Sequence, residues 1–247
     1  MSRLARVRAA TEELREAASG LRFRKPVTHV YNPLDYAHRT HLRYLRKFGD
    51  HRIRVLFLGM NPGPFGMVQT GVPFGEVASV RDFLGIRGRV DRPEREHPKR
   101  PVEGFACTRR EVSGARLWGA IAEHWRTPEN FFASHFIANY CPLVFMEESG
   151  RNRTPDQLPA RERKSLFEIC DRHLEQLVDA WEPEWVVGIG AFATRRATEA
   201  LDTKSIQIGT VLHPSPANPR ANRDWAGEAR QQLSDLGLCG AARAKSP

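Results

Sequence analysis

The chain has 247 residues and a formal charge of +9, so it is long enough for one large α/β core and basic enough to indicate a polyanionic partner, most simply nucleic acid. Its four cysteines contain no C-x-x-C pair, which argues against a zinc ribbon, a redox dithiol or a clustered iron–sulfur site and favours buried free thiols. The chain has neither an apolar run of 18 residues nor an N-terminal signal segment, so we expect an intracellular protein, in the cytoplasm and nucleoid of a bacterium or in a eukaryotic nucleus.

The apolar pattern predicts an α/β protein in which helices alternate with buried strands. In chain order, we expect helices over residues 3–19, 38–48, 77–85, 114–125 (with Ser113 as N-cap), 161–181, 191–201 and 221–236, strands over 55–58, 131–138, 185–189 and 206–212, and irregular segments at 26–36, 87–102 (exposed and strongly charged) and 150–159. Strands separated by helices imply right-handed crossovers and a central, mostly parallel sheet of about four strands flanked by helices. One domain is expected over residues 1–247, with a helix inside 1–24 and a flexible tail at 241–247.

Arginine dominates the basic residues, since only six of the 38 are lysine. A guanidinium group can bind phosphate through two parallel hydrogen bonds and can stack on bases, which supports a nucleic-acid partner. An arginine-rich composition also follows from GC-rich coding DNA without any functional cause. Charge alone therefore leaves both explanations open.

Two loops rich in glycine and proline follow expected strands. The first covers residues 59–75, where this composition predicts neither helix nor strand, and the second covers residues 213–219. An ordinary turn between strand and helix would explain either loop alone. Because parallel strands bring their carboxyl ends to one edge of a sheet, we expect Asn61, Asn139 and His213 to converge there.

Several common catalytic motifs are absent from the sequence. It contains no GxxxxGK[ST] phosphate loop, and its only G-x-G, at residues 188–190, lacks the third glycine of a dinucleotide fingerprint. It contains neither the H-x-E with P-C-x-x-C of zinc base deaminases nor a G-x-S-x-G nucleophile elbow. Phosphoryl, hydride and acyl transfer are therefore disfavoured.

The side chains expected to converge fit the chemistry of a pyrimidine base. The Asn139 amide offers one donor and one acceptor, which match O4 and N3–H of uracil but oppose the amino group and N3 of cytosine. Phe74 could stack on the base, His213 could donate to a base carbonyl oxygen, and Asn61 could hold a water molecule. Together these groups could cleave an N-glycosidic bond. Buried Asn and His are also common as structural groups whose hydrogen bonds are satisfied within the protein.

Two long motifs resemble those of the single-strand-selective monofunctional uracil-DNA glycosylases. The first motif is Gly59–Met67 with Gln69–Val77, and the second is His213–Pro216 with Asn218–Pro219 and Ala221–Asn222. The likeness also includes residues 97–102, 111–116, 139, 141–143, 149–152 and 154–155, so it spans roughly residues 25–240. It implies the uracil-DNA glycosylase fold and extrusion of the target nucleotide from DNA, because the scissile bond is inaccessible inside a duplex.

The resemblance also implies a role for each matching residue. Asn61 would position the hydrolytic water, and His213 would stabilise the departing uracil anion through O2, with help from the Met60 backbone N–H. Asn139 would read the pyrimidine edge, and Phe74 would stack on the ring. Since Asn61 is a neutral amide and cannot act as a base, departure of uracil would precede attack by water. No cofactor or metal is implied, and we expect a monomer.

Two further features concern substrate and product. Gly63 stands where some relatives carry a bulky tyrosine beside the pyrimidine C5 atom, so the resemblance implies activity on 5-hydroxymethyluracil and 5-formyluracil as well as uracil, in single- and double-stranded DNA. Neither motif contains lysine, so a Schiff-base lyase step lacks its nucleophile and the product would be an abasic site for base excision repair.

The loop after His213 would enter the duplex and fill the space left by the extruded base. It consists of Pro214, Ser215, Pro216, Ala217 and Asn218, and Ala217 replaces a longer basic residue expected from vertebrate members. Two alternatives remain open: a damaged-DNA-binding module without catalysis, and a glycosylase that favours deaminated purines such as xanthine.

Overall fold

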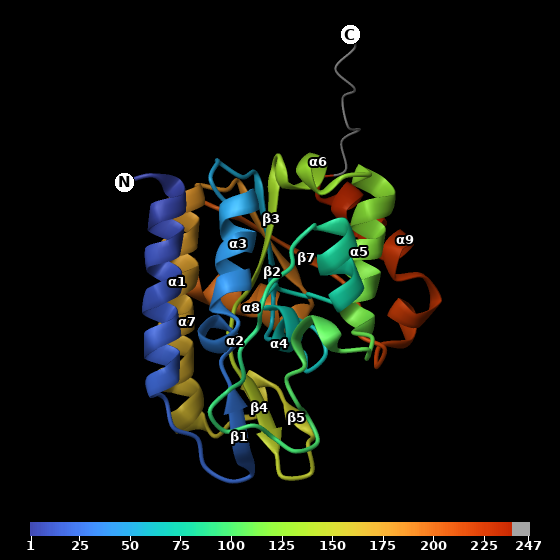
Figure 1. Ribbon diagram of the computed structural model, residues 1–247. Helices are drawn as coiled ribbons and strands as arrows, with labels where there is room; N and C mark the ends of the chain where they lie inside the picture. The colour runs from blue at the N-terminus through green and yellow to red at the C-terminus, as the bar shows by residue number, and fades with distance from the viewer. Residues whose placement is uncertain (239–247) are drawn as a thin grey trace.

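A four-stranded parallel sheet forms the centre of the computed structural model, which describes residues 1–238 (Figure 1). The helices are α1 (Arg3–Gly20), α2 (Pro33–Tyr36), α3 (His38–Phe48), α4 (Met67–Thr70), α5 (Val112–Trp125), α6 (Pro128–Phe132), α7 (Ala160–Trp181), α8 (Ala191–Ala200) and α9 (Pro219–Asp235). The strands are β1 (Val27–Tyr31), β2 (Val55–Gly59), β3 (His135–Asn139), β4 (Val144–Glu147), β5 (Asn152–Arg153), β6 (Trp185–Ile189) and β7 (Gln207–Val211). Short turns of other helix types cover Ser79–Phe83, Gly104–Ala106 and Pro155–Gln157.

The central sheet has the order β3-β2-β6-β7, and its neighbouring strands pair in parallel. Helices α5 and α9 pack on one face, where they meet alternate strand residues such as Phe57 and Ile137. Helices α3 and α7 pack on the other face, where Phe136 contacts Tyr44 and Trp181. The expected parallel sheet of four strands flanked by helices is therefore confirmed, and the carboxyl ends of all four strands meet at one edge.

A second, antiparallel sheet of order β1-β4-β5 lies beyond this edge and was absent from the sequence expectation (Figure 1). The expectation that residues 26–36 are irregular is wrong, since they contain β1 and α2. The polar loop expected at 150–159 contains β5 and one short helical turn. These strands have only two to five residues, and β1 pairs with β4 more than a hundred residues later, so the sequence around each strand does not show the pairing.

The boundaries of several other helices and strands also differ from expectation, because the capping residues that start a helix occupy only one or two positions in the sequence. The strand expected at 131–138 begins only at His135, since Thr127 and Pro128 start α6 as N-cap and first helical residue. The N-cap of α5 is Glu111, whose carboxylate accepts from the Ser113 N–H, and not Ser113 itself. Residues 59–75 are not wholly irregular, because α4 forms one turn that ends at the left-handed Gly71.

The charged segment at 87–102 is a loop, as expected, but part of it is buried. His97 is 1% exposed, and its Nε2–H donates to the Glu147 carbonyl of β4 at 3.0 Å while its Nδ1 accepts from the Lys99 N–H. The Tyr31 hydroxyl of β1 accepts from the His97 N–H and donates to the Arg100 carbonyl. The small sheet therefore holds this segment against the body of the protein.

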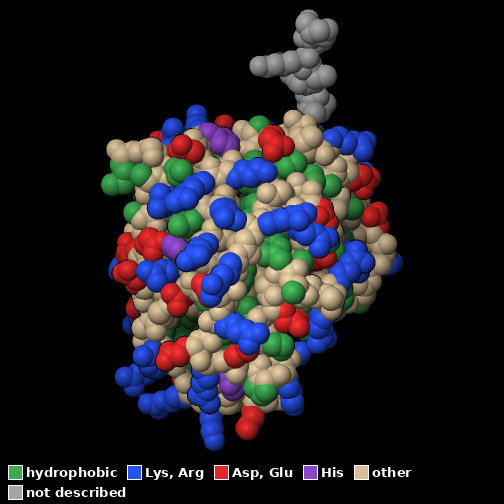
Figure 2. All heavy atoms as spheres, viewed as in Figure 1, with side chains coloured by type: hydrophobic (Ala, Val, Ile, Leu, Met, Phe, Trp, Pro, Cys, Tyr) green, Lys and Arg blue, Asp and Glu red, His purple; other side chains and the backbone are tan. Residues whose placement is uncertain are grey.

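Lys and Arg side chains spread over the face shown in Figure 2 and also gather at the end of the molecule that holds β1, β4 and β5. Three of the cysteines, Cys107, Cys141 and Cys170, are buried free thiols, and Cys239 and the tail expected at 241–247 lie outside the described residues. Among residues 1–238, no helix is long and apolar enough to cross a membrane.

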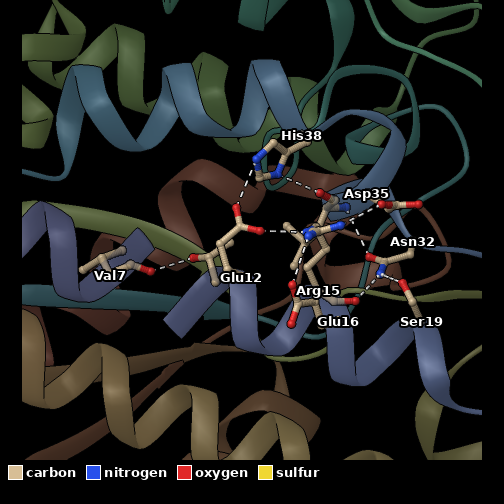
Figure 3. A network of polar contacts seen from close by, with 10 residues as sticks. Val7, Glu12, Arg15, Glu16, Ser19, Asn32, Asp35 and His38 are labelled. Carbon is tan, nitrogen blue, oxygen red and sulfur yellow. Dashed lines mark hydrogen bonds and ion pairs between the residues drawn. The ribbon is translucent and has the colours of Figure 1, made fainter. Parts of the chain in front are cut away.

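A network of ion pairs and hydrogen bonds connects α1 to α2 and α3 (Figure 3). Arg15 pairs with Glu12 at 2.8 Å and with Asp35 at 3.0 Å, and His38 lies 3.0 Å from Glu12. The Asn32 side chain donates to the Arg15 carbonyl at 3.1 Å and caps α2 with its oxygen. Because several groups share these contacts, the network fixes the packing of the N-terminal helix more firmly than an isolated surface pair would.

Buried histidines make the fold sensitive to acid. Burial lowers the pKa of His41 to about 4, of His135 to about 4 and of His173 to about 3. Between pH 6.5 and pH 4 the unfolded chain binds protons at these positions and the folded chain does not, so stability is lost as pH falls through this window. We expect the free energy of unfolding at pH 5 to be lower than at pH 7 by about 1–2 kcal/mol for each of these imidazoles, measured by urea titration.

A His173→Phe variant serves as the control for this effect, because the Nε2 atom of His173 is buried without a hydrogen-bond partner in the described part of the chain. This variant should retain a stable fold, and its free energy of unfolding should change less between pH 7 and pH 5 because the contribution of His173 is absent. Equal free energies of unfolding at pH 5 and pH 7 in the parent would contradict the assignment.

Candidate functional site

A cavity of about 680 Å³ opens at the carboxyl edge of the parallel sheet, within the range of small-ligand sites. The loops after β2 and β7 contribute to it, together with the last residue of β3, the N-terminus of α5 and the strand β5. Its lining residues are Met60, Asn61, Pro62, Gly63, Gly66, Met67, Phe74, Glu111, Ser113, Asn139, Asn152, Thr154, His213, Ser215, Ala217, Asn218 and Pro219. The convergence expected from the strand order is therefore present.

Most residues singled out from the sequence line this cavity: Met60, Asn61, Gly63, Phe74, Asn139, His213, Ser215, Ala217 and Asn218. Two others, Pro214 and Pro216, belong to the same loop as His213 but do not line the cavity. Pro214 is buried, and Pro216 is exposed.

The Asn61 side chain has a fixed orientation. Its Nδ2 donates to the Leu143 carbonyl at 3.1 Å, in the loop after β3. Because a carbonyl can only accept, the amide nitrogen must face Leu143, and the Oδ1 atom is left without a hydrogen-bond partner among the described residues. Asn61 can therefore accept a hydrogen bond from a molecule in the cavity.

Asn139 is 8% exposed, and its amide lacks a strong partner among residues 1–238. Its Nδ2 donates only to the Met67 thioether sulfur, at 3.3 Å, and sulfur is a weak acceptor. A Cβ atom on Gly59, the paired residue of β2, would overlap both Asn139 Oδ1 and the Phe74 ring. A buried amide without good partners is costly, so Asn139 is suited to pair with a ligand that supplies the missing donor and acceptor.

Phe74 adopts a backbone conformation that is rare for a residue with a side chain, with φ of 52°. Helix α5 holds it there, because the Trp118 Nε1–H donates to the Phe74 carbonyl at 3.1 Å. A Cβ on Gly114 would overlap the same carbonyl, so only glycine lets α5 approach so closely. The strained backbone is thus stabilised by packing that places the ring at the cavity wall.

His213 follows β7 and faces Phe74, with ring centroids 6.0 Å apart. Burial lowers the pKa of His213 to about 4, so the imidazole is neutral at pH 7 and can donate one N–H without carrying charge. Gly190 lies behind it, with φ of 93°, and a Cβ there would come within 3.0 Å of the His213 Cβ. The chain at residue 190 can therefore approach His213 this closely only because residue 190 is glycine.

Sequence reasoning missed Glu111 as a cavity residue. One carboxylate oxygen caps α5 through the Ser113 N–H at 3.0 Å, and the other lies against Gly63, where any Cβ would overlap it. Burial raises the pKa of Glu111. Glu111 falls in the stretch 111–116 that shares the family likeness, which is the signal that could have found it.

Asn152 and Thr154 were also missed, although both fall in the stretches that share the family likeness. They reach the cavity from the small sheet and the turn that follows it. Their position depends on pairing between β4 and β5, which sequence reasoning did not anticipate.

Arg116 of α5 and Asn222 of α9 hold the loop after His213. Arg116 of α5 donates to the Pro214 carbonyl at 3.1 Å and to the Asn222 Oδ1 at 2.9 Å. The Asn222 side chain in turn donates to the Pro216 carbonyl at 2.8 Å. Asn218 completes the loop as the N-cap of α9. These hydrogen bonds hold the loop against α5 and α9, while Pro216 and Ala217 remain exposed at its tip.

A model of the uracil DNA glycosylase superfamily matches residues 46–234. The chain is 51% identical over 231 residues to a single-strand selective monofunctional uracil-DNA glycosylase of Rattus norvegicus, which covers 92% of this chain and 83% of the relative. Proteins of the same description from Mus musculus and Bos taurus are 50% and 48% identical, with the same coverage.

A solved structure, wild-type SMUG2 of Pedobacter heparinus, shares the fold with a TM-score of 0.67 at 16% identity, over 92% of this chain and 97% of that one. The likeness of sequence extends through both long motifs and the segments between them. By family match and by identity over nine-tenths of its length, the chain belongs to the single-strand-selective monofunctional uracil-DNA glycosylases, within the uracil DNA glycosylase superfamily.

Proposed function

We propose that this protein hydrolyses the N-glycosidic bond of uracil in DNA and releases an abasic site without a lyase step. The observation that carries the proposal is the Asn139 amide, which is 8% exposed and has only a thioether as partner among the described residues. A uracil edge would supply the missing donor and acceptor, and a cytosine edge would oppose both. The family membership of the chain supports the same substrate.

The proposed reaction begins with departure of the base. Uracil leaves as an anion, and the neutral His213 N–H and the Met60 backbone N–H donate to its O2 as negative charge develops there. Such preorganised donors act on the transition state and need no proton transfer. The free Oδ1 of Asn61 then holds the water that attacks the sugar C1′ atom, because an amide can orient water but cannot deprotonate it beforehand.

The proposed substrate range includes 5-hydroxymethyluracil and 5-formyluracil, in single- and double-stranded DNA, with the protein acting as a monomer. Gly63 has no side chain to obstruct a substituent at C5, although the Glu111 carboxylate occupies the space directly beside it. The loop from Pro214 to Asn218 would fill the gap that the extruded base leaves in a duplex.

The test is an excision assay on oligonucleotides that carry one uracil, 5-hydroxymethyluracil, 5-formyluracil, xanthine or thymine, as single strands and duplexes. Alkali-dependent cleavage at uracil is the expected result, with strand scission absent before alkali. Tight binding without cleavage would instead indicate a damage-binding module, and faster cleavage at xanthine than at uracil would indicate a purine-directed enzyme.

The exposed Ala217 at the tip of the loop should weaken the hold on double-stranded product. A methyl group neither fills the stack nor contacts a phosphate, so an Ala217→Arg variant is expected to release abasic duplex several-fold more slowly than the parent. The comparison is made by stopped-flow dissociation from fluorescent product. Ala9→Arg, which adds the same charge at an exposed site on α1, is the control, and an unchanged off-rate for Ala217→Arg would refute this role.

A further inference from the structure

Two arginines lie over the ring of Phe65, a residue that the reaction described above does not use. The Cζ atom of Arg109 is 4.0 Å from the ring centroid, and the Cζ atom of Arg100 is 5.5 Å from it. Both distances fall within the range of cation–π contacts. The three side chains come from three separate segments, so only the tertiary structure brings them together.

This cluster of Phe65, Arg100 and Arg109 lies at the rim of the candidate active site. Gly63 and Gly66, which flank Phe65, both line the cavity. On the other side, Arg100 Nε donates to the Gly150 carbonyl at 3.0 Å, in the turn that leads into β5 and the cavity wall. The cluster therefore connects the loop after β2, which carries Phe65, to the turn before β5, which carries Gly150.

The charge of the cluster is not neutralised by carboxylates. Within residues 1–238, neither Arg100 nor Arg109 takes part in a salt bridge, whereas nearby Arg92 and Arg153 each pair with a glutamate. Exposed Lys99 and Arg110 adjoin the cluster in sequence, and exposed Arg151 follows Gly150, which Arg100 contacts. Among the described residues, none of these three forms an ion pair. Figure 2 shows Lys and Arg side chains over the face in view and at the end of the molecule that holds the small sheet.

The contact with Phe65 determines what the cluster can bind. Stacking holds a guanidinium by its flat face and leaves its N–H edge free for a planar or tetrahedral anion. The Arg109 guanidinium makes no hydrogen bond to any described residue, so its five donors are available. The half-buried ring is already covered by two guanidinium groups, which favours phosphate binding over stacking of a base.

We propose that Phe65, Arg100 and Arg109 form a binding site for the phosphodiester backbone of the DNA strand that carries the extruded nucleotide. This inference rests on the proposed function in one respect, namely that the occupant is DNA. Arg109 supplies the main contact, Phe65 holds its guanidinium in place, and Arg100 connects the site to the cavity wall. The site would anchor the strand even where no second strand exists for the Pro214–Asn218 loop to enter.

The test measures the affinity of Arg109→Ala for a single-stranded oligonucleotide by fluorescence anisotropy, from 50 to 300 mM salt. Loss of one phosphate contact lowers the slope of log K against log salt by about 0.7 and weakens binding several-fold at 0.15 M. Arg195→Ala is the matched control, because Arg195 is also exposed, lies over Phe192 and forms no salt bridge among the described residues. Unlike Phe65, which adjoins the cavity residue Gly66, neither Arg195 nor Phe192 is next in the chain to a residue that lines the cavity.

Two more variants separate charge from geometry. Arg109→Lys keeps the charge and should retain the salt slope, while losing part of the affinity because ammonium neither stacks flat nor binds phosphate bidentately. Phe65→Leu keeps apolar volume and should weaken binding in the same direction as Arg109→Ala. Thermal unfolding of each variant checks that the fold is intact.

The outcomes distinguish this inference from the proposed function. If Arg109→Ala has the same salt slope and affinity as the parent and as Arg195→Ala, the phosphate site is refuted, even when the parent excises uracil. If the parent does not excise uracil but its DNA binding depends on Arg109, the proposed function fails and the phosphate site stands.

Discussion

Replacing His213 with alanine is expected to lower the rate of uracil excision by about 10²–10³-fold, the usual effect of removing one donor that stabilises developing negative charge. The fold should remain intact, since the imidazole makes no hydrogen bond to any described residue. The measurement is single-turnover excision on a single-stranded oligonucleotide with one uracil, with abasic sites revealed by alkali. His124→Ala, which removes an exposed histidine outside the candidate active site, is the control and should behave like the parent.

The pH profile of the parent tests the charge state of this residue. Because burial lowers the pKa of His213 to about 4, the imidazole is neutral throughout the range from pH 5.5 to pH 8. The rate of the chemical step should therefore not fall as pH rises through 6.5. A decline there would mean that the protonated imidazole is the active form, and parental activity in His213→Ala would remove the residue from the mechanism.

Replacing Gly114 with alanine is expected to lower excision by about 10²-fold, although Gly114 lies on a helix and does not line the cavity. Its Cβ would overlap the Phe74 carbonyl, so α5 and Phe74 must separate. That movement breaks the hydrogen bond from Trp118 and shifts the Phe74 ring that would stack on uracil. Overpacking of this kind also costs about 1–3 kcal/mol of folding stability.

Gly119 provides a matched control on the same helix. A Cβ there meets no atom within 4 Å, so Gly119→Ala should leave excision unchanged and raise the free energy of unfolding by about 0.5–1 kcal/mol through helix propensity. Excision is measured by the uracil assay and stability by urea titration. Equal activity in the two alanine variants would show that the Phe74 position does not depend on the close approach of α5.

The central sheet could be predicted from sequence because its signals are local. The strands β2 and β6 are short apolar runs that the fold buries on both faces, and helices with a clear 3.6-residue period separate the strands. Parallel order follows from those crossovers, and with it the convergence of Asn61, Asn139 and His213 at one edge. The small antiparallel sheet was not predicted, since β1 finds its partner in β4 more than a hundred residues along the chain, and neither strand is longer than five residues.

The sequence by itself determined the fold class, the family and the chemical types of most cavity residues, because apolar period and motif spacing are properties of contiguous residues. Only the tertiary structure decided how those groups are held: the positive φ of Phe74 under Trp118, the Glu111 carboxylate against Gly63, and the contact of Arg109 with Phe65. Each of these depends on residues that pack together from distant segments. Burial then sets the pKa of His213, and burial is a property of the whole fold and not of the local sequence.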